Sequence, residues 1–241
     1  MEPVREKYFF DGREWDWEAL SAYLDHDYSR LQSDGRDRVS RALNLVEGRD
    51  VLDVGCHAGQ QAHYLAERGH RVLGVDVDDN LLEIARRKYG GPGVEFAGTD
   101  GTRLDFADGS FDCAILLEVL EHTEHPRGLV REIHRVLRPG GHLVVSVPNA
   151  ASYHTLARSL LLNLKSYYRR MESWPAFATD QRDHYYYWDP FTLYRLLNRQ
   201  GFRYVDHAFS DNLKLVNVLA GILPFLRRIS TCFILKVRRE G

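Results

Sequence analysis

The sequence predicts an α/β fold in which a doubly wound, mostly parallel sheet carries helices on both faces. Three observations support this expectation. Apolar segments of strand length alternate with amphipathic helical segments from residue 51 onward. The segment 111–117 is nearly all apolar, which is typical of a central parallel strand. The first strand ends in a glycine turn that leads directly into a helix.

The individual elements follow from periodicity and from turn residues. The expected strands are 51–55, 71–75, 94–97, 111–117 and 142–147, followed by an antiparallel pair at 202–209 and 231–237. The expected helices are 60–68, 80–88, 126–137 and 189–200. Asp78 or Asp79 is expected to cap the second helix, and the Pro-Gly-Gly run at 139–141 stops the third.

Length and composition indicate a soluble globular domain. The chain has 241 residues, of which 44% are hydrophobic and 27% charged, and such a chain can bury a sizeable core. Its first fifteen residues are charged and aromatic, so no secretory signal is expected. The longest apolar run, 215–226, is too short to span a bilayer. Three well-separated cysteines are expected to be buried free thiols, which suits a reducing cytoplasm.

The charge is unevenly distributed along the chain. Residues 151–241 hold 14 Lys and Arg against 7 Asp and Glu, whereas the whole chain holds 32 against 34. The first 150 residues are therefore acidic and the remainder is basic. A basic C-terminal part fits an anionic substrate or a membrane surface, and a solvated helix face accounts for it equally well.

The turn after the first strand has the pattern Asp53-x-Gly55-x-His57-x-Gly59. Glycines let a ligand approach the backbone, and the following helix offers free N–H groups. Dinucleotide-binding enzymes use G-x-G-x-x-G, and this turn lacks that spacing. The pattern therefore favours a nucleotide-like cofactor other than NAD.

Two acidic positions follow the next strands. Asp76 ends the second strand, where a carboxylate hydrogen-bonds ribose hydroxyls, with helix capping as the alternative. Asp100 and Gly101 follow the third strand, where an ordinary turn explains the same residues. Occurring in this order after the glycine turn, the two positions favour a nucleoside site.

These motifs resemble those of the class I S-adenosylmethionine (SAM)-dependent methyltransferases, particularly the type 11 group that includes the ubiquinone-biosynthesis methyltransferases. Glu118-Val119-Leu120-Glu121-His122 after the fourth strand and Leu137-Arg138-Pro139-Gly140-Gly141 before the fifth extend the likeness, which covers about residues 50–149. The resemblance implies a Rossmann-like sheet of seven strands with one antiparallel strand. It also implies SAM as cofactor, with S-adenosylhomocysteine as product.

The resemblance implies a set of cofactor contacts: Asp53, Gly55, Cys56, His57, Gly59, Asp76, Val77, Asp100, Gly101 and Glu118. Asp53 is expected to face the methionine amino group, while Asp76 and Asp100 hold the ribose and the adenine. His57 stands where the family pattern has a middle glycine. It either adopts the turn that a glycine would or projects toward the cofactor carboxylate.

On this basis residues 1–241 are expected to form a single methyltransferase domain. Its expected parts are a mainly helical N-terminal decoration (1–45), a SAM-binding core (46–149), a lid or substrate insertion (150–188) and the C-terminal half of the sheet (189–241).

An alcohol acceptor must lose its proton, so a base is expected on the ligand side of the sheet. The catalytic candidates are His122, His184 and Glu121, and each could equally be structural. With Glu118 these residues also resemble the cation site of metal-using methyltransferases, but the same residues occur in family members without metal. We expect no metal.

The sequence thus predicts a cytoplasmic SAM-dependent methyltransferase acting on a small-molecule acceptor. The expected reaction is O-methylation of a glycan, glycolipid or prenyl-phenol, with peripheral membrane contact through the basic C-terminal segments. No DNA partner is expected and RNA is disfavoured. Two alternatives stay open: an RNA methyltransferase, with or without a metal, and a non-catalytic SAM-binding protein. The oligomeric state is left open.

Overall fold

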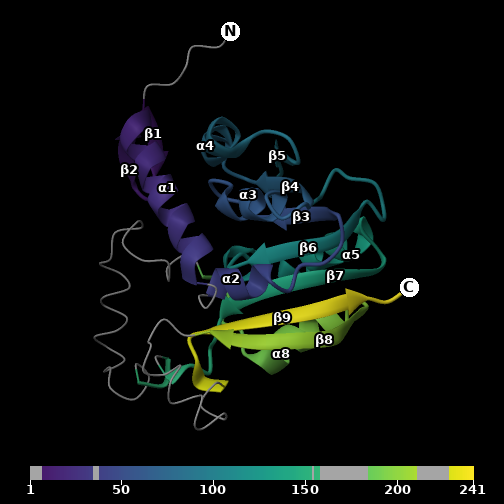
Figure 1. Ribbon diagram of the computed structural model, residues 1–241. Helices are drawn as coiled ribbons and strands as arrows, with labels where there is room; N and C mark the ends of the chain where they lie inside the picture. Colours follow the sequence, from purple (N-terminus) through teal and green to yellow (C-terminus); the bar gives the residue numbers. More distant parts are fainter. Residues whose placement is uncertain (1–6, 35–37, 154, 158–183, 211–227) are drawn as a thin grey trace.

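The computed structural model describes residues 7–34, 38–153, 155–157, 184–210 and 228–241. Its central feature is a seven-stranded sheet with the order β5-β4-β3-β6-β7-β9-β8 (Figure 1). The strands are β3 (Asp50–Val54), β4 (Arg71–Asp76), β5 (Val94–Gly98), β6 (Phe111–Leu117), β7 (Leu137–Pro148), β8 (Phe202–Ser210) and β9 (Cys232–Arg239). β9 runs antiparallel to both of its neighbours, whereas the other pairings are parallel. The predicted mixed sheet of seven strands is confirmed.

Helices cover both faces of this sheet (Figure 1). On one face lie α2 (Arg38–Leu43), α3 (Gln60–Ala66) and α4 (Asp79–Tyr89), and on the other lie α5 (Pro126–Val136) and α8 (Pro190–Asn198). Strand β6 feeds both cores, because Cys113 and Ile115 point to the first face and Ala114 and Leu116 to the second. Burial of each large apolar side chain stabilises the sheet by about 1.5–3 kcal/mol.

The helix ends follow the predicted signals. Asp78, one of the two predicted caps, caps α4, since its Oδ1 accepts hydrogen bonds from the backbone N–H groups of Asn80 and Leu81 at 2.8 and 3.3 Å. Asp189 caps α8 by accepting from the N–H groups of Phe191 and Thr192. Each cap of this kind contributes about 1 kcal/mol.

Strand β7 begins at Leu137, five residues earlier than predicted. Leu137 pairs with Phe111 across a register shift in the β6–β7 ladder. The Arg138 guanidinium then binds Asp112, and also Asp50 at 3.0 Å, so it holds the start of β7 against the neighbouring strands. The Pro-Gly-Gly run ends α5 as predicted, but the chain enters the sheet at once.

The N-terminal part differs from the expectation of mainly helical structure. Residues 7–16 form a hairpin of β1 (Lys7–Phe10) and β2 (Arg13–Asp16), which precedes α1 (Trp17–Asp34). Tyr8 and Phe10 alternate inward and are almost completely buried with Leu20 and Leu24 of α1. The hairpin was not predicted, because neither of its four-residue strands alternates regularly between apolar and polar residues.

The three cysteines are free and buried, as predicted. None of the described helices is long and apolar enough to cross a membrane.

Candidate active site

A cavity of about 1410 Å³ opens at the carboxyl ends of β3, β4, β5 and β6. Nine of the residues predicted from the sequence line it: Gly55, Cys56, His57, Asp76, Val77, Asp100, Gly101, Glu118 and His122. The other predicted residues, Asp53, Gly59, Glu121 and His184, do not line it. The cavity is thus built at the edge of the parallel sheet where ligands bind in this class of fold.

The glycine turn is held by close packing and by left-handed backbone conformations. A Cβ atom on Gly55 would lie 2.4 Å from Val119 Cγ2, and one on Gly59 would lie 2.7 Å from Phe96 Cζ. His57 has φ 50°, so it takes the turn that a glycine would, the first of the two predicted outcomes. Its ring meets that of Phe10 edge to face, with centroids 5.1 Å apart. The imidazole therefore contacts the N-terminal hairpin.

Asp53 lies beneath the cavity on β3 and is 1% exposed. Among the described residues, neither of its carboxylate oxygens meets a hydrogen-bond partner. Burial, and then the nearby charge of Asp76, raises the pKa of Asp53 to about 8. A buried carboxyl group beneath the cavity favours the binding of a positively charged group there.

Asp76 ties the glycine turn to the end of β4. Its Oδ2 accepts from the backbone N–H of His57 at 2.8 Å, and its Oδ1 accepts from the N–H of Asp78 at 3.1 Å. The side chain also lines the cavity. Asp76 therefore has a structural role in addition to the predicted ribose contact, and helix capping falls to Asp78 alone.

Asp100 forms the turn that was the alternative reading of its position. Its Oδ1 accepts from the N–H groups of Thr102 and Arg103 at 2.8 and 2.9 Å. These bonds, led by the one from Arg103, lower the pKa of Asp100. Because the residue also lines the cavity, the turn forms part of the cavity wall.

Glu118 stands at the end of β6 with φ 58°, an unusual conformation for a residue other than glycine. Its Oε1 accepts from Ser146 Oγ at 2.9 Å, and its Oε2 accepts from Arg38 Nη1 at 2.8 Å. The carboxylate thereby joins β6, β7 and α2 at the cavity wall.

The N-terminal helices supply a wall of the cavity that the sequence did not reveal. Asp27, Arg30 and Leu31 of α1, and Arg38 of α2, line it. The sequence interpretation treated residues 1–45 as decoration, and no local motif marks these side chains as functional. They reach the cavity only because the hairpin and α1 pack across α3 and α4.

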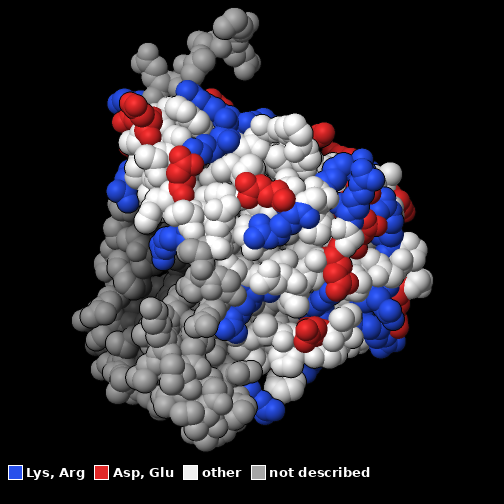
Figure 2. All heavy atoms as spheres, viewed as in Figure 1, with Lys and Arg blue, Asp and Glu red and all other residues white. Residues whose placement is uncertain are grey.

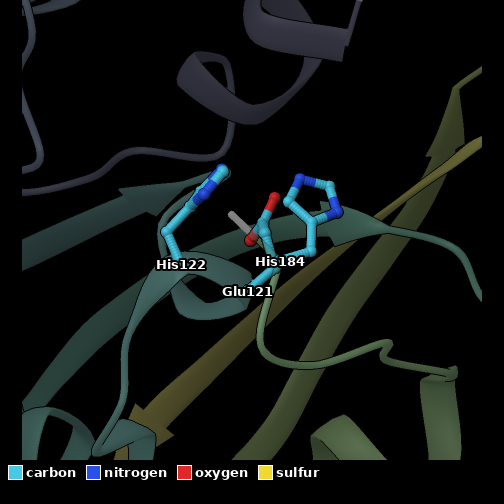
Figure 3. Close-up of side chains that lie close together, drawn as sticks. All are labelled: Glu121, His122 and His184. Carbon is cyan, nitrogen blue, oxygen red and sulfur yellow. The ribbon is translucent and has the colours of Figure 1, made fainter. Parts of the chain in front are cut away.

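Two of the catalytic candidates come from the short 3₁₀ helix η1 (Leu120–His122), and His184 comes from the segment before α8. Figure 3 shows the Glu121 carboxylate between the two imidazoles. One ligand atom of each residue lies within 4.8 Å of the others, and the rings of His122 and His184 have centroids 4.6 Å apart. The structure therefore brings the three predicted catalytic residues together.

Glu121 is the buried member of this cluster, at 1% exposure. Burial, and then the charge of Glu118, raises the pKa of Glu121 to about 8. His122 lines the cavity, so the cluster reaches the ligand space through that side chain. Glu118 does not belong to the cluster, because Arg38 and Ser146 engage its carboxylate.

Several predicted features fall outside the described residues. They include most of the 150–188 insertion and the apolar run 215–226. On the face drawn in Figure 2, the described part carries positive and negative side chains interspersed. Membrane contact stays a prediction.

Comparison with known proteins agrees with this geometry. Residues 52–145 match the family model of a methyltransferase domain. A ubiquinone biosynthesis O-methyltransferase from Alkalilimnicola ehrlichii is 36% identical over 140 residues, which cover 57% of this chain and 55% of that protein. A demethylmenaquinone methyltransferase from Clavibacter sepedonicus is 35% identical over 134 residues, 53% of this chain and 54% of that protein. The chain spans about half the length of the curated relatives it matches.

Solved structures share the fold at low sequence identity. A SAM-dependent methyltransferase from Mesorhizobium loti superposes with a TM-score of 0.61 at 21% identity, covering 87% of this chain and 100% of that one. The [4+2]-cyclase SpnF superposes with a TM-score of 0.58, also at 21% identity, covering 99% of this chain and 87% of that one. The fold therefore accommodates different chemistries, and the site residues must decide between them.

Proposed function

Because residues 52–145 form a domain of the class I SAM-dependent methyltransferase family, we propose that this chain transfers a methyl group from SAM to a small-molecule acceptor. One observation carries the proposal. The glycine turn after β3 and the acidic residues at the ends of the adjacent strands β4, β5 and β6 line one cavity. When bound, SAM supplies a methyl group on a positively charged sulfonium.

The residues present fit such a cofactor. The cofactor carries a net positive charge, and Asp53 is a buried carboxyl without a hydrogen-bond partner among the described residues. Asp76 and Glu118 add carboxylates to the wall. The packing around Gly55 and Gly59 brings backbone, rather than side chain, to the ligand.

The acceptor is assigned to the part of the cavity beyond Glu118, where His122 lines the wall. An acceptor hydroxyl must lose its proton as its oxygen is methylated. We assign this activation to the cluster of His122, Glu121 and His184, whose ligand atoms lie within 4.8 Å of one another. The chain's main contribution is to position the acceptor for in-line transfer.

A phenolic hydroxyl of the prenyl-phenol class is the acceptor we favour among those predicted. The relatives named for ubiquinone and menaquinone biosynthesis support this choice. Tyr185 and Tyr187 lie within three residues of His184, are 60% and 51% exposed, and offer aromatic faces next to the cluster. Glycans and glycolipids are the competing outcomes of the test.

The test supplies labelled SAM and the purified chain to separate fractions of prenyl-phenols, glycolipids, glycans, other small molecules and RNA. Label in a phenolic product, held as a methyl ether that withstands the alkali which releases methanol from methyl esters, would support the proposal. Label in RNA would favour the RNA methyltransferase alternative instead. Binding of SAM measured by calorimetry, with no label in any fraction, would favour a non-catalytic protein.

The matched variant for this test is Asp76→Ala. Removing the carboxylate is expected to abolish calorimetric SAM binding together with transfer, because Asp76 both lines the cavity and holds the glycine turn. Methyl transfer by D76A at the wild-type rate would contradict the assignment of the cavity as the SAM site.

A further inference from the structure

A second, smaller cavity of about 260 Å³ is lined by residues of helices α5 and α8, which lie on the same face of the sheet (Figure 1). Three of its six lining residues are arginines and none is acidic: Arg127, Thr192, Arg195, Leu196, Arg199 and Gln200. None of the six lines the larger cavity assigned to the cofactor. The smaller cavity is therefore a separate, strongly basic site.

The positive charge of this cavity is not balanced by neighbouring acids. None of the three guanidinium groups forms an ion pair with a carboxylate of the described residues. Helix α8 carries no acidic residue, and in α5 Glu132 is bound to Arg135 at 2.8 Å. The carboxylate of Asp189, the cap of α8, accepts from the N–H and the hydroxyl of Thr192. Such a concentration of one charge attracts an anion.

The arginines occupy helix positions that an anion would stabilise. Arg127 lies in the first turn of α5, where the helix dipole disfavours a cation, and the cap residue His125 makes no side-chain hydrogen bond to that turn. Arg195 and Arg199 lie four residues apart, so their like charges are neighbours on one helix face. Their place near the carboxyl end of α8 offsets only part of this repulsion. An anion held by both helices relieves the rest.

We propose that Arg127, Arg195 and Arg199 bind a phosphomonoester group in this cavity. Guanidinium groups bind phosphate oxygens through paired hydrogen bonds, and the half-buried amide of Gln200 adds a further donor. A phosphomonoester carries a charge of about −1.5 to −2 at neutral pH, which suits three arginines better than a singly charged carboxylate does. The cavity is smaller than the roughly 300–1,000 Å³ of sites for drug-sized ligands, so the body that carries the phosphate is small where it enters.

The proposed site lies beside the larger cavity along α5. His125, which precedes this helix, lines the larger cavity, whereas Arg127 lines the smaller one. A phosphate group at Arg127 is thus held by the helix turn that borders the larger cavity. The proposal does not depend on methyl transfer, because its readout is binding of the phosphate group itself.

The test measures binding of inorganic phosphate and of glycerol 3-phosphate to the purified full chain by calorimetry, at constant ionic strength in chloride. We expect one equivalent to bind. Arg195→Gln and Arg199→Gln should each weaken binding by about tenfold or more, because each removes charge-assisted hydrogen bonds. Arg131→Gln is the matched control, since it removes the same charge from the exposed side of α5 but does not line the cavity. Its affinity should be close to that of wild type.

A lipid arm identifies the source of the phosphate group. It uses phosphatidylcholine vesicles with and without phosphatidic acid, whose head group is also a phosphomonoester. Binding of these vesicles that R195Q and R199Q lose, with only weak binding of glycerol 3-phosphate, would support the site and assign it to a lipid. The reverse pattern would support it and assign it to a soluble ligand.

Two results would overturn the proposal. One is the absence of wild-type binding in both arms. The other is equal weakening in R131Q and in R195Q, because net charge and not the cavity would then govern binding. Circular dichroism identifies the folded variants. Calorimetric binding of SAM to the same samples is measured separately and should match wild type, so failure of this site is distinguished from failure of the cofactor assignment.

Discussion

The backbone N–H of His57 donates a hydrogen bond to Oδ2 of Asp76 at 2.8 Å. This bond joins the glycine turn after β3 to the carboxyl end of β4, and it holds a histidine at φ 50°. The Asp76 carboxylate therefore fixes the backbone of the glycine turn, and it also lines the cavity at the end of β4.

Substituting His57 should separate backbone strain from side-chain packing. His57→Gly relieves the left-handed conformation, worth about 1 kcal/mol, and loses the ring contact with Phe10, so the free energy of unfolding should change by less than about 1 kcal/mol. His57→Val should lower it by about 1–3 kcal/mol, because a β-branched residue resists this conformation. Urea denaturation measures both variants, and equal stability of the two would show that the backbone is not strained.

Asp53 should make stability depend on pH. Its pKa is about 8 in the folded chain, above the ordinary 3.8, so folding favours the protonated form. The contribution of the protonated Asp53 carboxyl to the free energy of unfolding is fully present below about pH 4. It is lost as the pH rises toward 8. Between pH 5 and 8 the free energy of unfolding of wild type should therefore fall more steeply than that of Asp53→Asn. Denaturant titrations at several pH values measure this slope, and parallel slopes would refute the assignment.

Glu118 should matter more for the cofactor than for folding. Arg38, its partner, is 44% exposed in its side chain, so loss of the ion pair in Glu118→Gln should change the free energy of unfolding by less than about 1 kcal/mol. Calorimetric affinity for SAM should fall by about tenfold, a loss of about 1.4 kcal/mol, because a carboxylate facing a cation is neutralised.

Arg38→Gln is the matched control for Glu118, since it breaks the same ion pair and keeps the carboxylate. SAM affinity in this variant should be equal to or greater than that of wild type. A tenfold loss in R38Q as well would mean that the ion pair, and not the charge of Glu118, supports binding.

Asn149 should be a strong determinant of stability at the end of β7. It is 2% exposed, and its amide donates to the carbonyl oxygens of Arg228 and Ser230 at 2.9 and 2.8 Å. Asn149→Ala should lower the free energy of unfolding by about 2–3 kcal/mol, because buried carbonyl groups lose their donors. Asn198→Ala removes a single half-buried bond to Phe202 and should cost about 1 kcal/mol or less. Thermal unfolding compares the two, and equal losses would contradict the argument.

Much of the fold could be predicted because its signals are local. Residues 111–117 were predicted as a strand and form β6 over the same range, since an uninterrupted apolar run fits a strand buried on both faces. The early start of β7 was not predictable, because the pairing of Leu137 with Phe111 is a tertiary contact.

The residues of the candidate site also fall into those marked by local motifs and those brought in by tertiary contacts. The turn from Gly55 to His57 and the acidic strand ends were located from the sequence, because short motifs fix their positions relative to the sheet. Asp27, Arg30 and Arg38 were missed, since they reach the cavity from helices whose own sequences carry no ligand-binding pattern. The grouping of His184 with Glu121 depends on backbone hydrogen bonds between distant segments.

The two ends of the predicted insertion are joined at the sheet. Asn149 and Trp188 form a parallel bridge, and the N–H of Ala150 donates to the carbonyl oxygen of Trp188 at 2.8 Å. The bridge holds the two ends of the insertion together, whatever the length of the chain between them. The entropy of closing that loop changes only slowly with its length. The chain between these two points can therefore differ in length among relatives without moving the ends of the strands. Its last residues, from His184 onward, contact η1, so they must change together with that segment.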